Sequence, residues 1–197
     1  MRHKTMLPWI AVAAFLLVGA APASADTLCV KEGGGDGCYA TIQLAVDAAE
    51  SGDTIDVYPG DYDETATGRT VLDGTLIENG PHQFGLFIGL GKDGVTIRGV
   101  DETGKPICRA RDVQAFITTN ATNNFGYSGI FIEADGVTLQ GLDIGPNLPG
   151  SNKTIEVIGD AFTLRACDIS DLYGSVYLND WRFDEDEDVS HLQSYRI

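Results

Sequence analysis

One sequence motif recurs three times along this chain, and it constrains the fold more than any other feature. The copies run from Asp93 to Asp101, from Asp135 to Asp143 and, more loosely, from Asp160 to Asp168. The first two copies start 42 residues apart and the last two start 25 residues apart. Such a period is typical of a solenoid, in which stacked units bury the apolar faces that no single unit can bury alone.

The longer interval has two explanations. Two coils of 21 residues each would place Ile107–Cys108 and Ala115–Ile117 in the additional strands. Alternatively, a single coil carries a long loop through Asn120–Asn124. We favour two coils, because Phe116 and Ile117 fall near the positions where the motif's apolar strand would repeat.

Short apolar strands alternate with glycine turns over most of the chain. Each coil offers about three strands, as in Ile130–Ile132, Val137–Leu139 and Leu142–Ile144. Before them, the apolar residues from Ile42 to Ala49 have helical spacing, and Thr41 is placed to cap the start. We therefore expect a short amphipathic helix that covers the exposed core of the first coil.

The N-terminal residues 1–25 have the pattern of an export signal. Basic residues precede an apolar stretch at 6–21, and the small residues Ala23-Ser24-Ala25 follow. The stretch is shorter than the ~20 apolar residues of a membrane span. We expect an exported mature chain of one domain, 26–197, without membrane insertion. No capping segment closes the last coil, so we also expect the domain to be incomplete at its C-terminus.

The mature chain is strongly acidic. Removal of the signal leaves 11 of the 13 basic side chains against 29 acidic ones, a net charge of −18. Such a surface repels nucleic acid and anionic lipid, which excludes both as partners. An acidic polysaccharide would be repelled as well, unless a bound cation intervenes.

Four cysteines remain in the mature chain, and pairing is the default in an exported protein. Cys29 and Cys38 flank a glycine-rich stretch that is flexible enough to close a small ring, so we expect a disulfide between them. Cys167 occupies the inward position of the motif, where a free thiol packs as a small hydrophobe. A bridge between Cys108 and Cys167 is the less favoured alternative.

Three segments near the N-terminus, with the motif copies, resemble a known superfamily. The stretch from Ala40 to Ala49, then Gly52-Asp53-Thr54-Ile55 and Pro59-Gly60-Asp61-Tyr62, is similar to the opening of pectin-lyase-like proteins, which include polysaccharide lyases and pectin-methylesterase-like enzymes. The Asp-Gly-Val-Thr-Ile-Arg-Gly copies resemble their coil repeat. The resemblance implies an all-β fold, a right-handed parallel β-helix with a short N-terminal capping α-helix, and polysaccharide as the partner.

The outward polar positions of the motif supply the first candidate site. Asp101, Asp143 and Asp168 are expected to form one column, in which strands lie about 4.8 Å apart and the carboxylates repel each other. A calcium ion would relieve this repulsion. In the resembled lyases calcium neutralises the uronate while a basic residue removes a proton, which nominates Arg98 and Arg165 as catalytic. The alternative is that these side chains only solvate an outer face.

Two further groups could contact a ligand. Tyr177 and Trp181 could form a platform on which a sugar stacks, but the favoured alternative is that Trp181 and Phe183 pack under a loop. The acidic run Asp184–Asp188 has a spacing that could hold calcium but is more typical of a solvated loop.

The sequence predicts a secreted β-helix domain that binds or processes polysaccharide, and the form that we favour is a calcium-assisted lyase-type module. The clustered aspartates and Gly-His-Gly segment of polygalacturonases are missing, and so is the catalytic context of pectin methylesterases. The alternative function is therefore a non-catalytic surface or adhesion scaffold.

Overall fold

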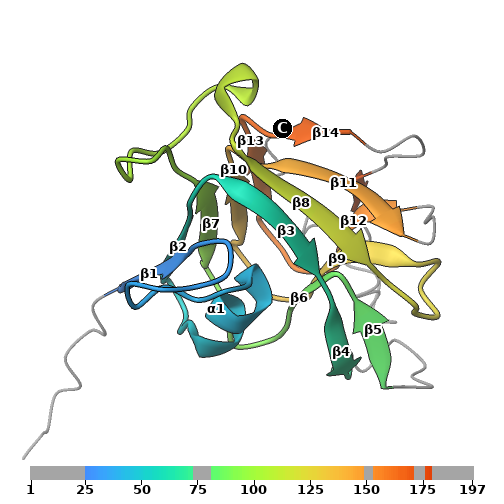
Figure 1. The fold of residues 1–197 in the computed structure, drawn as a ribbon. Helices are drawn as coiled ribbons and strands as arrows, with labels where there is room; N and C mark the ends of the chain where they lie inside the picture. Colours follow the sequence, from blue (N-terminus) through green and yellow to red (C-terminus); the bar gives the residue numbers. More distant parts are fainter. Residues whose placement is uncertain (1–24, 73–80, 149–152, 171–175, 179–197) are drawn as a thin grey trace, which may run out of the picture.

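The computed structural model describes residues 25–72, 81–148, 153–170 and 176–178, and most of their strands lie in three parallel sheets (Figure 1). The first sheet contains β1 (Thr27–Val30), β2 (Thr54–Val57), β7 (Thr96–Gly99), β10 (Thr138–Gln140) and β13 (Thr163–Arg165). The second contains β3 (Gly60–Glu64), β8 (Ala115–Asn120), β11 (Asp143–Leu148) and β14 (Asp168–Ile169). The third contains β6 (Leu86–Ile88), β9 (Ser128–Ile132), β12 (Lys153–Val157) and β15 (Val176–Leu178).

The chain visits the three sheets in the same order again and again. After β7 in the first sheet come β8 in the second and β9 in the third, and the next coil repeats this with β10, β11 and β12. Each strand pairs in parallel with the corresponding strand of the neighbouring coil. The fold is therefore mostly β and β-helix-like, as the repeated motif predicts.

The three motif copies stack in register. Thr96 pairs with Thr138, and Thr138 pairs with Thr163. Because β7 and β10 are direct neighbours, the 42-residue interval is one coil, and the prediction of two 21-residue coils is wrong. Residues 115–117 start β8 of the second sheet instead. Spacing could not reveal this, because strands of all three sheets share the same apolar alternation.

The interior of the coil is apolar throughout. Columns of fully buried aliphatic side chains from successive coils fill it, such as Ile55, Ile97 and Leu139 in the first sheet. A second, smaller cluster lies outside this core and contains Phe84, Phe87 and Phe131. It includes residues of the antiparallel pair β4 (Ala66–Arg69) and β5 (His82–Phe84), which links β3 to β6.

The helix α1 (Ile42–Ala48) packs against β1, β2, β3 and β6 near the first coils (Figure 1). Thr41 caps it as predicted: the backbone N–H of Leu44 donates to the Thr41 Oγ1 at 3.2 Å. The apolar residues at helical spacing, including Ile42 and Val46, are buried in the core. The helix is short, as predicted, with 7 residues, and it ends at Ala48 because Ala49 is already in an extended conformation.

Two buried polar side chains attach this helix to the stack. The side-chain amide of Gln43 pairs with the backbone of Phe87 as a neighbouring strand would. Its Nε2 donates to the Phe87 carbonyl at 3.1 Å, and its Oε1 accepts the Phe87 N–H at 2.8 Å. Phe87 lies in β6, the edge strand of the third sheet. The carboxylate of Glu64 accepts the N–H groups of Ile42 and Gln43 at 2.6 and 3.1 Å. Backbone groups that lack partners at a sheet edge and a helix start are thereby satisfied.

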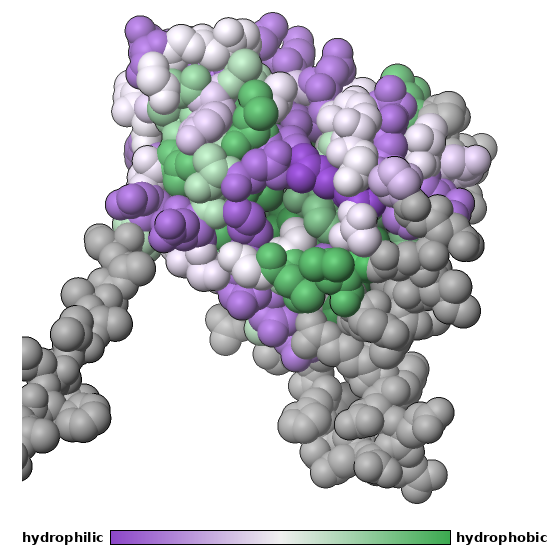
Figure 2. All heavy atoms as spheres, turned by 90° about the horizontal axis from the view of Figure 1, so that it is seen from below, coloured by the Kyte–Doolittle hydropathy of each residue, from purple (hydrophilic) through white to green (hydrophobic). Residues whose placement is uncertain are grey.

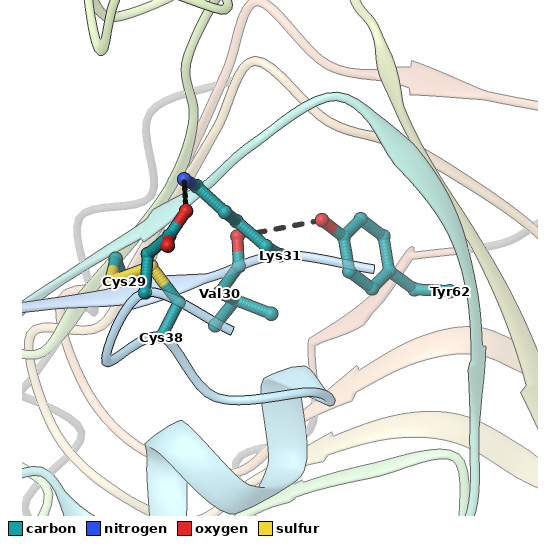
Figure 3. Close-up of a disulfide and its surroundings, with 6 residues drawn as sticks. Cys29, Val30, Lys31, Cys38 and Tyr62 are labelled. Carbon is teal, nitrogen blue, oxygen red and sulfur yellow. Dashed lines mark hydrogen bonds and ion pairs between the residues drawn. A yellow bond between two sulfur atoms is a disulfide. The ribbon is translucent and has the colours of Figure 1, made fainter. Parts of the chain in front are cut away.

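The predicted disulfide between Cys29 and Cys38 is present (Figure 3). It closes the glycine-rich loop beside β1, and the Lys31 ammonium pairs with Asp36 of this loop at 3.3 Å. Nearby, the buried Tyr62 hydroxyl donates to the Tyr58 carbonyl at 2.8 Å, and burial raises the pKa of Tyr62 to about 12. Cys108 and Cys167 are both free thiols, which confirms that they do not form a bridge.

The surface seen from below is mostly polar, with hydrophobic side chains gathered in patches (Figure 2). No helix among the described residues is both long and apolar enough to cross a membrane. The predicted export signal lies outside the described residues except for Ala25.

Candidate functional site

Polar side chains line up near the ends of four strands of the first sheet. Asp56, Arg98, Gln140 and Arg165 occupy matching positions on β2, β7, β10 and β13. Each follows a buried aliphatic residue, so strand alternation directs these four side chains away from the core. They form a column on the outer face of the coil.

Within this column, Arg98 is held by a carboxylate. Its Nε and Nη2 atoms donate to the two carboxylate oxygens of Asp56 at 2.5 and 3.3 Å. The Asp56 side chain is only 13% exposed and that of Arg98 30% exposed. The pair is therefore a two-pronged, partly buried ion pair that joins neighbouring coils, and the guanidinium is already occupied.

Next to this column, residues 101–114 leave the stack as an insertion at the corner between β7 and β8. In the following coil only Gly141 and Leu142 separate β10 from β11. The buried Gln140 amide holds the insertion by donating from Nε2 to the Ile107 carbonyl at 2.7 Å. Gly141 allows this approach, because a Cβ there would lie 2.7 Å from the Cβ of Ile107.

Asp101 fixes the start of the insertion. Its Oδ1 accepts hydrogen bonds from the Thr103 hydroxyl at 2.6 Å and from the N–H groups of Thr103 and Lys105 at 2.9 and 3.0 Å. The hydrogen bond from the Thr103 hydroxyl contributes most to a pKa of Asp101 that lies below its usual value. The Asp101 carboxylate therefore stabilises the conformation of the loop.

The insertion surrounds a hollow of about 730 Å³, which we call the basic hollow. Its charged lining consists of Lys105, Arg109 and Arg111 against Asp101 and Asp112. Arg111 pairs loosely with Asp112 at 3.7 Å, and both side chains are largely exposed. The lining thus carries one net positive charge on a chain whose overall charge is strongly negative.

Apart from Lys92, the described lysines and arginines that form no ion pair lie in the lining of this hollow or, for Arg165, next to Gln140, which contacts the insertion. Elsewhere in the described part of the chain, lysines and arginines form ion pairs or, for Lys92, donate to the carbonyl groups of Asp47 and Ala49. The ion-paired residues are Lys31, Arg69, Arg98 and Lys153, besides Arg111 in the hollow. Lys105, Arg109 and Arg165 form no ion pair with a described residue. Their charges are available to an anion.

The predicted aspartate column is only partly present. Asp143 and Asp168 are neighbours, but the partner of Asp143 on the other side is Phe116. Asp101 is therefore outside the column, because the insertion that it begins shifts the register of this coil. Asp143 also accepts the Ser170 hydroxyl at 2.9 Å.

This donor set does not fit a calcium site made by the protein alone. Calcium takes six to eight oxygens, whereas the column offers two carboxylates. No group of three or more His, Cys, Asp or Glu side chains among the described residues could hold a metal ion. We therefore derive no chemical step through a cation.

The predicted sugar platform is described for one of its two residues. The Tyr177 ring is 46% exposed, and the Lys153 ammonium lies 4.6 Å from its centroid. Lys153 also pairs with the buried Glu156 at 2.7 Å. This ion pair keeps the Lys153 ammonium over one face of the Tyr177 ring. Trp181 and the acidic run 184–188 lie outside the described residues.

Sequence reasoning missed the basic hollow. Its residues form no motif, and their common location follows only from the corner at which the insertion leaves the stack. The available signal was the concentration of Lys105, Arg109 and Arg111 within seven residues of an acidic chain.

Comparisons with known proteins support the fold. Neither a scan with models of protein families nor a search of curated proteins finds a match. Among solved structures, two of the pectin methylesterase from Aspergillus niger, in differently deglycosylated forms, are similar with TM-scores of 0.53 and 0.52 at 20% identity. These matches cover 80% of this chain and 46% of the esterase.

The Escherichia coli protein YbhC is similar with a TM-score of 0.52 at 17% identity, over 85% of this chain and 50% of that one. This chain thus spans about half the length of the structures it matches. At such identities the likeness concerns the fold alone, and it supports a β-helix-like fold for this chain.

Proposed function

We propose that this chain is a secreted, right-handed parallel β-helix domain that binds an acidic polysaccharide at the basic hollow. The observation that carries the proposal is the gathering of unpaired basic side chains, Lys105, Arg109 and Arg165, at and beside this hollow. Guanidinium and ammonium groups without a partner bind carboxylates well. The pectin methylesterase neighbours support a polysaccharide rather than a small anion as the ligand.

The local positive charge of the hollow also explains how an acidic polysaccharide could bind to a chain whose overall charge would repel it. Charges beyond about 10 Å are screened at 0.1 M salt, so a ligand at the hollow responds mainly to the charges nearby. Binding should therefore be weak at very low salt, where the whole negative chain repels the glycan, and should pass through a maximum before high salt screens the hollow itself.

The test is binding of polygalacturonate oligomers, measured by calorimetry, to the wild type and to Lys105→Ala/Arg109→Ala. The double variant should bind about tenfold more weakly, at roughly 0.7 kcal/mol for each exposed charge contact. Its control is Thr67→Glu/Thr70→Glu, which changes the net charge equally at two exposed positions of the β4 region. Equal affinity of the wild type and the hollow variant would refute the proposal.

The ion pair with Asp56 supports a structural role for Arg98 rather than a catalytic one. Both carboxylate oxygens of Asp56 occupy its guanidinium, so of the two nominated bases only Arg165 has no such partner. A non-catalytic scaffold is therefore the second candidate function. Incubation of polygalacturonate with the wild type and with Arg165→Ala distinguishes them, because a lyase generates unsaturated ends that absorb in the ultraviolet.

Calcium assistance stays a prediction. If a cation bridges the glycan to Asp143 and Asp168, chelation with EDTA should weaken binding, and Asp143→Asn/Asp168→Asn should remove this calcium dependence. Affinity that is the same with calcium and with EDTA would leave the basic side chains as the sole anion-binding groups.

A further inference from the structure

An exposed aromatic ring lies beside the basic hollow on the second sheet. Phe116 of β8 is 46% exposed, although its neighbours Ala115 and Ile117 are buried in the core. Phe116 comes two residues after Gln114, which lines the hollow. Two residues along a strand span about 7 Å, so a ligand in the hollow can reach this ring.

Carboxylates lie on both sides of the ring. Asp61 of β3 and Asp143 of β11 are the register partners of Phe116 on the two neighbouring strands. Neighbouring strands of a sheet lie about 4.8 Å apart. Asp61 is exposed and Asp143 partly exposed, so the two side chains flank the ring at the surface.

This arrangement suits an uncharged sugar ring. An aromatic face offers apolar contact to the C–H groups of a sugar, and carboxylates accept hydrogen bonds from its hydroxyl groups. The same carboxylates repel a uronate, by about 0.7 kcal/mol each for charges about 6 Å apart in water. The ring and its flanks therefore select against a charged sugar, whereas the hollow selects for one.

We propose that Phe116, Asp61 and Asp143 form a second subsite, which takes an uncharged sugar next to the anionic sugar in the basic hollow. This inference rests on the proposed function and narrows it to glycans that combine charged and uncharged units. It replaces Tyr177 as the sugar-stacking residue of the described surface.

Two probes separate the subsites: polygalacturonate oligomers, in which every sugar is charged, and hyaluronan oligomers, in which charged and uncharged sugars alternate. Phe116→Ala should weaken hyaluronan binding about three- to tenfold, whereas Phe116→Tyr should retain it. With EDTA present, Asp61→Asn/Asp143→Asn should strengthen polygalacturonate binding about threefold for each carboxylate at low salt. The gain should disappear in about 1 M salt, where the Debye length is about 3 Å.

The control is Asp63→Asn, which removes the same charge from β3 but pairs with Thr118 instead of Phe116. It should change the polygalacturonate affinity less than Asp61→Asn does. Hyaluronan binding that is absent from the wild type, or unaffected by Phe116→Ala, would overturn the inference. If Lys105→Ala/Arg109→Ala still weakens polygalacturonate binding about tenfold in that case, the proposed function stands and only the second subsite fails.

Discussion

Replacing Gln43 by leucine tests how strongly this side chain attaches α1 to the edge strand β6 of the third sheet. Leucine has a similar size and helix propensity, but it cannot form the two hydrogen bonds with the backbone of Phe87. Both bonds are buried, and an unsatisfied buried backbone group costs about 1–3 kcal/mol. Two such groups are left unsatisfied, so we expect Gln43→Leu to lose about 2–6 kcal/mol of unfolding free energy.

The measurement is urea unfolding followed by circular dichroism, with the slope of the transition compared between variants. Hydrogen exchange adds a local readout, because the Phe87 amide should exchange faster in the variant. The matched control is Leu44→Gln, the opposite replacement at the next position of the same helix. Leu44 is 51% exposed, so this change should stay within about 0.5 kcal/mol.

A loss below about 1 kcal/mol in Gln43→Leu, with a normal control, would refute the reasoning. It would mean that Phe87 finds other partners when the side-chain amide is removed. An equal loss in both variants would instead point to helix propensity as the cause.

Three further variants test other contacts. Burial raises the pKa of Glu64 above its ordinary value of 4.5, so its contribution to stability is full below pH 4.5 and declines as the pH rises; the advantage of the wild type over Glu64→Gln should shrink accordingly in urea titrations between pH 4 and 8. Arg98→Met should cost about 1–3 kcal/mol, because it leaves the mostly buried Asp56 carboxylate unpaired; unchanged thermal stability would contradict this structural role. Gly99→Ala should strongly destabilise the chain, because the new Cβ would lie 2.0 Å from the Gly141 carbonyl oxygen; a melting temperature like that of the wild type would show that the coils can separate.

The stacking of the motif could be predicted from sequence because identical positions face the core in every coil. Val95, Val137 and Phe162 occupy equivalent places in the three copies, and all are buried. The disulfide could also be predicted, because a nine-residue separation across glycines leaves few alternatives.

What lies at the corners could not be predicted in the same way. Insertions there make no periodic contacts, so nothing in the spacing tells a loop from another coil. Spacing therefore predicts that Asp101 joins the aspartate column, whereas in the structure Asp143 pairs with Asp168 on one side and with Phe116 on the other. The strand β1 was missed for a related reason: it belongs to no copy of the motif, and it joins the first sheet by pairing with β2.

The corner insertion has an evolutionary consequence. Its 14 positions, 101–114, are tied to the ladder mainly through Gln140 and a few backbone contacts, while β7 pairs with β10 independently of them. The sequence of this segment could thus change during evolution, with other side chains in place of its basic residues, while the paired strands beneath it stay the same. An engineer could graft a foreign loop between Val100 and Ala115 on the same grounds.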